Sequence, residues 1–139
     1  MAAAIAGENL DAPCYEACLM ALNPIKFSDS QGSIPEVKDC QSTFAISSLY
    51  LCARVYCSEQ NRLEGLHEQN KTCQAKVRTA LPPWSVVANY TDDEVSALRR
   101  VEKLDWENAT TFGEVVVPSA HLFHLAYDTL VCSYRPMWL

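Results

Sequence analysis

Two cysteine-bounded stretches decide the fold of this chain: residues 14–18 (CYEAC) and residues 40–57 (CQSTFAISSLYLCARVYC). In the longer stretch, Ala45, Leu49, Cys52 and Tyr56 follow the spacing i, i+4, i+7, i+11, which places them on one side of a helix. This spacing predicts a helix from about residue 37 to residue 57. Cys14 and Cys18 lie one helical turn apart, so they face the same way and would tie one helix to two points of a neighbour. The alternative is a redox-active or metal-binding dithiol.

The chain contains seven cysteines, which are Cys14, Cys18, Cys40, Cys52, Cys57, Cys73 and Cys132. Zinc and disulfides are the competing explanations for such a number. Zinc sites favour paired C-x2-C spacings, whereas the short spacings here are C-x3-C and C-x4-C. We therefore expect disulfides among the six cysteines between positions 14 and 73. The sequence does not determine which pairs form, and it leaves the fate of Cys132 open.

Three N-glycosylation sequons accompany the cysteines, at Asn70, Asn89 and Asn108. The two signals together favour an extracellular protein or one in the lumen of the secretory pathway. The alternative is a chance content of Asn and Thr. The N-terminus shows no basic segment followed by an apolar one, so we expect a chain trimmed of its signal, with residues 1–11 as a flexible tail.

Composition and charge narrow the classes of function. Residues are 49% hydrophobic and 20% charged, which fits one globular domain over residues 1–139. A net charge of -6 and no basic run longer than Arg99-Arg100 argue against nucleic-acid binding. No apolar run is long enough to span a membrane. Glycine-rich phosphate-binding motifs are absent, so we expect no cofactor. Oligomeric state cannot be inferred.

The remaining periodicity predicts an all-α, small disulfide-linked bundle of about five helices. Besides the helix over 37–57, helices are expected over 13–22 and 60–81. Thr91 and Glu94 form a capping box that starts a fourth helix, with a buried stripe of Val95, Leu98, Val101 and Leu104. Ser119 caps a fifth helix to about Cys132, with an apolar face of Phe123, Ala126, Tyr127 and Leu130. Residues 24–35 are expected to be a loop, and 105–118 a connector with one short strand at 115–117.

A polar group on the expected fifth helix is the first candidate site. His121, His124 and Asp128 follow the spacing i, i+3, i+7 and share a face opposite Phe123. Two imidazoles and a carboxylate can bind a metal or perform acid/base chemistry. The alternative is a solvated polar face, which is typical of surface helices. Three such groups hold a divalent ion only if a fourth group or water completes the shell, so we assign no metal, but we expect any small-molecule or metal site to involve this face.

A second candidate lies in the connector, where Asp105 and Glu107 flank Trp106. Paired carboxylates can act as acid and base, and an indole can line a pocket. The alternative is surface charge around one anchoring aromatic residue. Trp84 is a further candidate for binding, or else an anchor of the core or of an interface.

At its cysteines the chain resembles the N-terminal extracellular domain of fungal ferric reductase transmembrane components. The resembling residues are Cys14-Tyr15-Glu16-Ala17-Cys18, Cys40, and Cys52-Ala53-Arg54-Val55-Tyr56-Cys57, with Trp84 downstream. The resemblance implies a non-catalytic extracellular domain that serves docking or surface access of ferric chelates. Its partner would be a small-molecule ligand or a membrane-embedded reductase portion.

Two other functions remain open. One is a small lumenal or secreted enzyme of fungal secondary metabolism that performs acid/base or cyclisation chemistry in an aromatic pocket. The other is a secreted interaction protein. A deep pocket holding His121 or Asp105 would favour the enzyme, whereas solvated positions for these groups would favour a binding domain.

Overall fold

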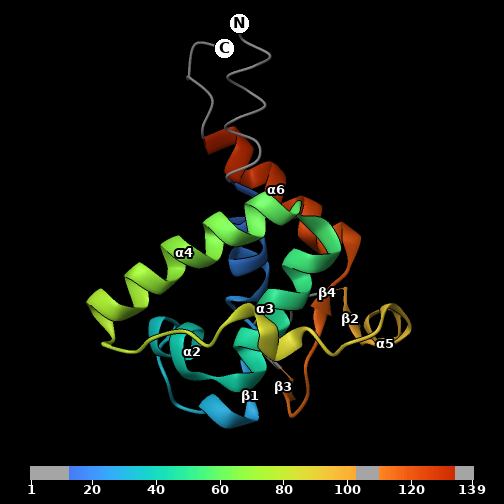
Figure 1. Ribbon diagram of the computed structural model, residues 1–139. Coiled ribbons are helices and arrows are strands. Elements are labelled where there is room, and N and C mark those ends of the chain that lie inside the picture. Colours follow the sequence, from blue (N-terminus) through green and yellow to red (C-terminus); the bar gives the residue numbers. More distant parts are fainter. Residues whose placement is uncertain (1–12, 103–109, 134–139) are drawn as a thin grey trace, which may run out of the picture.

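The computed structural model describes residues 13–102 and 110–133. A helix over residues 13–22, called the N-terminal helix below, comes first. The elements that follow are β1 (Lys26–Phe27), the 3-10 helix η1 (Ser28–Ser30), α2 (Pro35–Gln41), α3 (Thr43–Tyr56), α4 (Glu59–Lys76), the 3-10 helix η2 (Trp84–Val87), α5 (Asp92–Ala97), β2 (Arg100–Val101), β3 (Thr111–Phe112), β4 (Val117–Pro118) and α6 (Ala120–Ser133) (Figure 1). The predicted small, disulfide-linked helical fold is confirmed. Over these residues, no helix combines the length and the apolar character that a membrane span needs.

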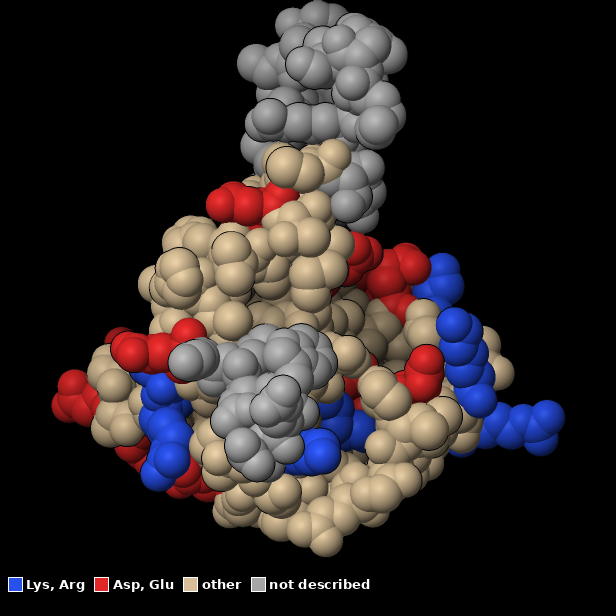
Figure 2. Space-filling view, turned by 180° about the vertical axis from the view of Figure 1, so that it is seen from behind, with Lys and Arg blue, Asp and Glu red and all other residues tan. Residues whose placement is uncertain are grey.

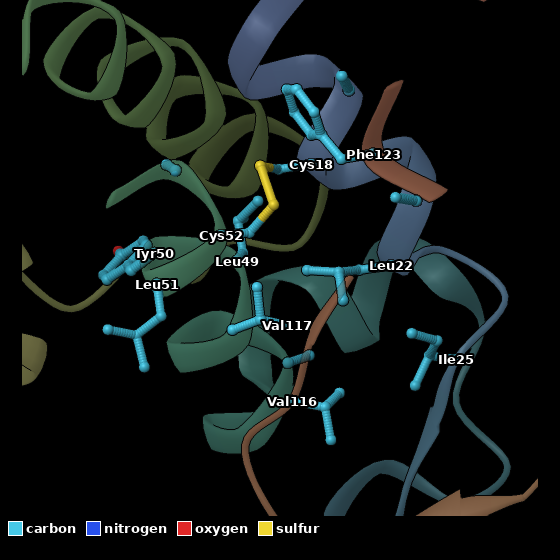
Figure 3. Packing of buried hydrophobic residues seen from close by; sticks show 14 of the residues in the cluster. Cys18, Leu22, Ile25, Leu49, Tyr50, Leu51, Cys52, Val116, Val117 and Phe123 are labelled. Atoms are coloured by element: carbon cyan, nitrogen blue, oxygen red, sulfur yellow. A yellow bond between two sulfur atoms is a disulfide. The ribbon is translucent and has the colours of Figure 1, made fainter. Parts of the chain in front are cut away.

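Helix α3 occupies the centre of the molecule (Figure 1). Eight of its 14 residues are buried, including every residue from Ser48 to Ala53. Burial on all sides means that other elements surround the helix, and α2, α4, η2 and β4 each pack against it. The side chain of Leu49 lies in this core next to the Cys18–Cys52 bridge, and Val117 and Val116 lie successively farther from the bridge (Figure 3).

Two disulfides join the N-terminal helix to α3 and the residue after it. Cys14 pairs with Cys57 and Cys18 pairs with Cys52, with Cα atoms 5.8 and 5.9 Å apart. Residue numbers rise along one partner and fall along the other, so the two helices run antiparallel. The prediction that the C-x3-C pair ties one helix to two points of a neighbour is confirmed. A third bridge, Cys40–Cys73, joins α2 to α4.

The helix predicted over residues 37–57 is interrupted at Ser42, which makes that prediction wrong. Ser42 has extended backbone angles, and its hydroxyl oxygen accepts a hydrogen bond from Ala45 N, as an N-cap of α3. The same hydroxyl donates to Asp29 Oδ1, and Asp29 Oδ2 accepts from Phe44 N. Two polar side chains thus satisfy the first amides of a new helix, and the chain turns between α2 and α3.

The end of the N-terminal helix is capped by a buried lysine. Lys38 Nζ donates to the main-chain carbonyls of Leu22, Asn23 and Ile25 at 3.1, 2.7 and 3.0 Å. Only the charged ammonium has three protons to donate. A positive charge at the C-terminal end of a helix also interacts favourably with the negative end of the helix dipole. Lys38 therefore fixes both the end of this helix and the position of α2 beneath it.

The C-terminal limits of two predicted helices are wrong. Helix α4 ends at Lys76 rather than residue 81, because Arg78 takes a left-handed backbone conformation (φ 56°). Helix α5 is confirmed at its start, where Thr91 and Glu94 form both hydrogen bonds of the capping box. It ends at Ala97, however, and Val101 lies in strand β2. The Arg100 guanidinium donates to two carbonyls at the end of α5, which stabilises this early stop.

Two short parallel strand pairs are present, and the first of them joins an early segment of the chain to a late one. Strand β1 pairs with β3, and β2 pairs with β4. The loop predicted over 24–35 thus holds a strand, a 3-10 helix and the first residue of α2, and the strand predicted at 115–117 begins two residues later, at Val117. Ser119 begins α6 as predicted, since its hydroxyl accepts from Leu122 N. Helix α6 then packs on α3 through parallel rings of Phe123 and Tyr56, 4.3 Å apart.

Candidate functional site

An apolar hollow of about 530 Å³ separates the N-terminal helix from α6. The N-terminal helix contributes Leu19 and Met20 to its wall, and α6 contributes Leu122, Leu125 and Ala126. These α6 residues follow the spacing i, i+3, i+4, so one face of the helix lines the hollow. Figure 2 shows the molecule from behind, where uncharged residues form a broad surface above the middle and acidic side chains lie at the edges of that surface. We call this cavity the apolar hollow.

A second hollow of about 350 Å³ adjoins the first, between the N-terminal helix, α2 and α4. Its wall includes the Cys40–Cys73 disulfide and the carboxylates of Glu16, Glu36 and Glu68. Lys76 is the basic residue in this wall. We call this cavity the acidic hollow. Leu19 and Asp39 line both cavities, so the two meet at these side chains.

Asp39 is the titratable group at this junction. Burial of its carboxyl raises the pKa to about 6; the Lys38 ammonium opposes this rise, and the Glu36 carboxylate adds to it. A carboxyl with such a pKa exchanges protons near neutral pH, which ordinary surface aspartates do not. Its chemistry suits acid/base transfer or pairing with a cation.

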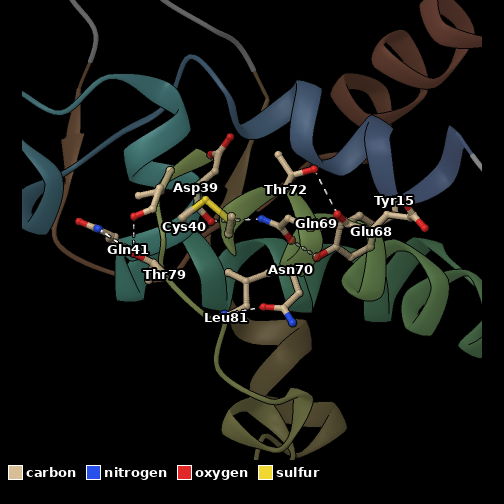
Figure 4. The surroundings of a disulfide bond; sticks show 12 residues. Tyr15, Asp39, Cys40, Gln41, Glu68, Gln69, Asn70, Thr72, Thr79 and Leu81 are labelled. Atoms are coloured by element: carbon tan, nitrogen blue, oxygen red, sulfur yellow. Dashed lines mark hydrogen bonds between the residues drawn. A yellow bond between two sulfur atoms is a disulfide. The ribbon is translucent and has the colours of Figure 1, made fainter. Parts of the chain in front are cut away.

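The wall behind Asp39 is held by a buried hydrogen-bond chain. Tyr15 Oη donates to Gln69 Oε1, and Gln69 Nε2 donates to the main-chain carbonyl of Asp39 at 3.1 Å (Figure 4). Burial raises the pKa of Tyr15 above its ordinary value. Gly65 lets the Tyr15 ring lie against α4, since a Cβ there would come within 2.1 Å of the ring. These hydrogen bonds orient α2 against α4 and so position the Asp39 backbone.

Sequence reasoning did not identify Asp39, Gly65 or Gln69. Asp39 stands beside a cysteine in an unremarkable polar stretch, and only folding places it between two cavities. A glycine inside a helical pattern was the available signal for Gly65, because an isolated helical glycine often marks a close packing contact.

The predicted polar face of α6 is exposed. His121, His124 and Asp128 are each exposed, and none of them lines either hollow. The edge of the His124 ring contacts Phe123, with ring centroids 5.4 Å apart. Over the described ranges, no three His, Cys, Asp or Glu side chains could hold a metal ion together.

Of the tryptophan and connector residues predicted to form a site, the structure describes Trp84 alone. Trp84 is partly buried, stacks on Tyr50 at 5.2 Å and carries the Arg62 guanidinium over its ring. These contacts fit an anchor between η2 and α3 and do not bring Trp84 into either hollow. Asp105, Trp106 and Glu107 lie outside the described residues.

The predicted glycosylation sites and the seventh cysteine differ in their exposure to solvent. Asn89 is exposed just before the capping box, whereas Asn70 is partly buried in α4 and its Oδ1 accepts from Leu81 N. Asn108 lies outside the described residues. Cys132, whose fate the sequence left open, is an exposed free thiol on α6.

The comparisons with known proteins give no relative. No protein-family model, curated protein or solved structure matches this chain.

Proposed function

We propose that this chain is a non-catalytic extracellular binding domain. Its cysteine pattern resembles that of the N-terminal extracellular domain of fungal ferric reductases. The apolar hollow is the observation that carries the proposal. It is a surface cavity of ligand size, and its walls come from the disulfide-linked N-terminal helix and from α6. The solvated positions of His121 and His124 support a binding domain over an enzyme that uses them.

The ligand or partner in this proposal docks without being transformed. It is a small molecule, such as a ferric chelate, or the membrane-embedded portion of a reductase. The net charge of -6 repels anions over the whole surface, so neutral and cationic chelates suit the domain better than anionic ones.

The sequence of the full-length transcript tests the reductase context. We expect the reading frame to continue after Leu139 into several apolar segments of about 20 residues each, which are transmembrane helices. A stop codon shortly after Leu139 would contradict the reductase context and would leave a free-standing secreted domain.

An enzyme of fungal secondary metabolism is the second candidate, and the Asp39 carboxyl favours it. Its pKa of about 6, beside an apolar cavity, suits a general acid or base. Incubation of the purified protein with a metabolite extract of the producing organism, followed by mass spectrometry, tests this candidate. Products that form with the native protein but not with Asp39→Asn would establish an enzyme and contradict the non-catalytic proposal.

A further inference from the structure

We propose that the apolar hollow binds a hydrophobic amine, whose apolar body lies between the N-terminal helix and α6 and whose ammonium group pairs with the Asp39 carboxylate. This inference rests on the proposed binding function and narrows it to one class of ligand. Three features of the cavity carry it: its apolar wall, the position of its carboxylate and the charge of the neighbouring hollow.

The wall of the cavity suits an apolar body. Leu19, Leu122 and Ala126 form its inner part, while Met20 and Leu125 remain 39% and 57% exposed at its margins. A volume of about 530 Å³ lies within the range of small-molecule sites. Apolar ligand atoms in this position would cover hydrophobic side chains that water now contacts.

The position of Asp39 determines which polar group such a ligand carries. Leu122, Leu125, Ala126 and Thr129 form the α6 wall and bring no charge, so Asp39 is the charged residue of the apolar hollow. Gln69 donates to the main-chain carbonyl of Asp39 and not to its carboxylate, and Asp39 lines both hollows. A partly buried carboxylate gains most from a positively charged partner that also donates hydrogen bonds.

The acidic hollow strengthens the preference for a cation. Glu16, Glu36 and Glu68 lie on the far side of Asp39, against one basic residue, Lys76. Their summed potential attracts an ammonium group to the junction and repels a carboxylate. An apolar amine is thus the complementary ligand, and a fatty acid of the same length is the mismatched one.

The groups that face Asp39 also set the pH dependence of binding. They are Glu36 and Lys38 on α2, Tyr15 and Glu16 on the N-terminal helix, and Glu68 and Lys76 on α4. The α6 wall contributes no titratable group. Ammonium binding needs the ionised carboxylate, so the affinity should fall as the pH drops below about 6, the pKa of Asp39.

Three probes of equal chain length test the inference by calorimetric titration of the intact, oxidised protein at pH 7.5. They are octylammonium, 1-octanol and octanoate. We expect octylammonium to bind about tenfold more tightly than 1-octanol, and octanoate to bind most weakly. Asp39→Asn should remove most of the preference for octylammonium over 1-octanol and leave 1-octanol unchanged. Lowering the pH to 5 should weaken octylammonium binding to the native protein about tenfold and have no effect on the Asp39→Asn variant.

Two further variants separate this site from general surface charge. Asp128→Asn removes an exposed carboxylate from α6 outside the hollow and should change no affinity. Leu125→Lys adds a cation to the exposed margin of the wall and should weaken octylammonium while it strengthens octanoate. Thermal unfolding of each variant verifies that it is folded.

The inference is overturned if octylammonium binds no more tightly than 1-octanol, or if Asp39→Asn and Asp128→Asn weaken it equally. Either result would leave the transcript test of the reductase context untouched. Conversely, a transcript without membrane segments combined with Asp39-dependent amine binding would overturn the reductase context and retain the ligand class.

Discussion

The region before residue 78 and the described region after residue 83 are held together by different means. The first contains all three disulfides, which span 43, 34 and 33 residues of sequence. In the second, α5 and α6 are positioned by two-residue strands, by the Arg54–Asp92 ion pair at 2.8 Å and by the Tyr56–Phe123 stack. The first region is therefore held by disulfides as well as by packing, whereas the second is held by noncovalent contacts.

The apolar hollow lies where these two regions meet. One of its walls, the N-terminal helix, is cross-linked to α3, and the other wall, α6, has no disulfide within the described residues. A ligand in the hollow would add contacts to the less constrained wall. The difference between the regions therefore implies that ligand binding should stabilise α6 more than the N-terminal helix.

Removal of the buried bridge of the cross-linked region should have the largest effect. The double variant Cys18→Ala, Cys52→Ala releases the link between the N-terminal helix and the middle of α3, and both residues are completely buried. We expect a loss of about 3–5 kcal/mol in the free energy of unfolding, measured by urea denaturation. Cys132→Ala is the matched control, and its exposed free thiol should contribute almost nothing. Equal effects of the two changes would show that the bridges do not distinguish the regions.

Lys38→Met tests the noncovalent part of the same region. The substitution keeps an apolar stem of similar length but removes the donors to the carbonyls of Leu22, Asn23 and Ile25. We expect a loss of about 3 kcal/mol, because buried acceptors would lose a charged partner. Lys26→Met, on an exposed strand residue, provides the control. An effect under about 0.5 kcal/mol would mean that water replaces the ammonium without cost.

The sequence predicted the helical fold and the presence of disulfides better than it predicted the site. The cysteine spacing favoured disulfides over zinc without determining the pairs, and the caps Thr91 and Ser119 were correct because each depends on a residue three positions later. The break at Ser42 was missed because its second determinant, Asp29, lies 13 residues earlier. Long-range contacts of this kind leave no periodic signal.

The same reasoning explains the outcome for the candidate site. Helical spacing correctly grouped His121, His124 and Asp128, but spacing does not show whether a face meets a cavity. Asp39 acquires its pKa from burial between elements that are distant in sequence. Local patterns therefore predict which side chains share a face, whereas the chemistry of the site depends on tertiary packing.

Asp39→Asn should stabilise the cross-linked region at neutral pH. The pKa of about 6 in the folded protein exceeds the ordinary value near 4, so the folded state binds more protons between these pH values. The stability of the native protein should then decrease as the pH rises from about 4 to 6, and the variant should lack this component. At pH 7.5 we expect a gain of about 1 kcal/mol for the variant, measured by thermal unfolding across the pH range. A variant that is less stable than the native protein at pH 7.5 would contradict a desolvated carboxylate.

Thr91→Ala tests the region without disulfides. The hydroxyl of Thr91 accepts from Glu94 N at 3.0 Å in the capping box of α5. Its loss should cost about 1 kcal/mol, because the first turn of the helix then has an unsatisfied amide. Thr91→Ser keeps the acceptor and should preserve most of the stability. If the alanine and serine variants unfold at the same temperature, the cap does not contribute in this short helix.

The smallest effect is expected on the polar face of α6. His121 and His124 are both exposed and line neither hollow, so His121→Ala and His124→Ala should each change stability by less than about 0.5 kcal/mol. They should also leave octylammonium affinity unchanged, since neither imidazole lines the hollow. Leu125→Lys, on the wall of the hollow, is the matched change on the same helix and should alter that affinity. If a histidine variant weakened ligand binding as much as Leu125→Lys, the ligand would have to contact the polar face as well. The binding surface would then extend around α6, and the function would depend on the very residues that the sequence had singled out.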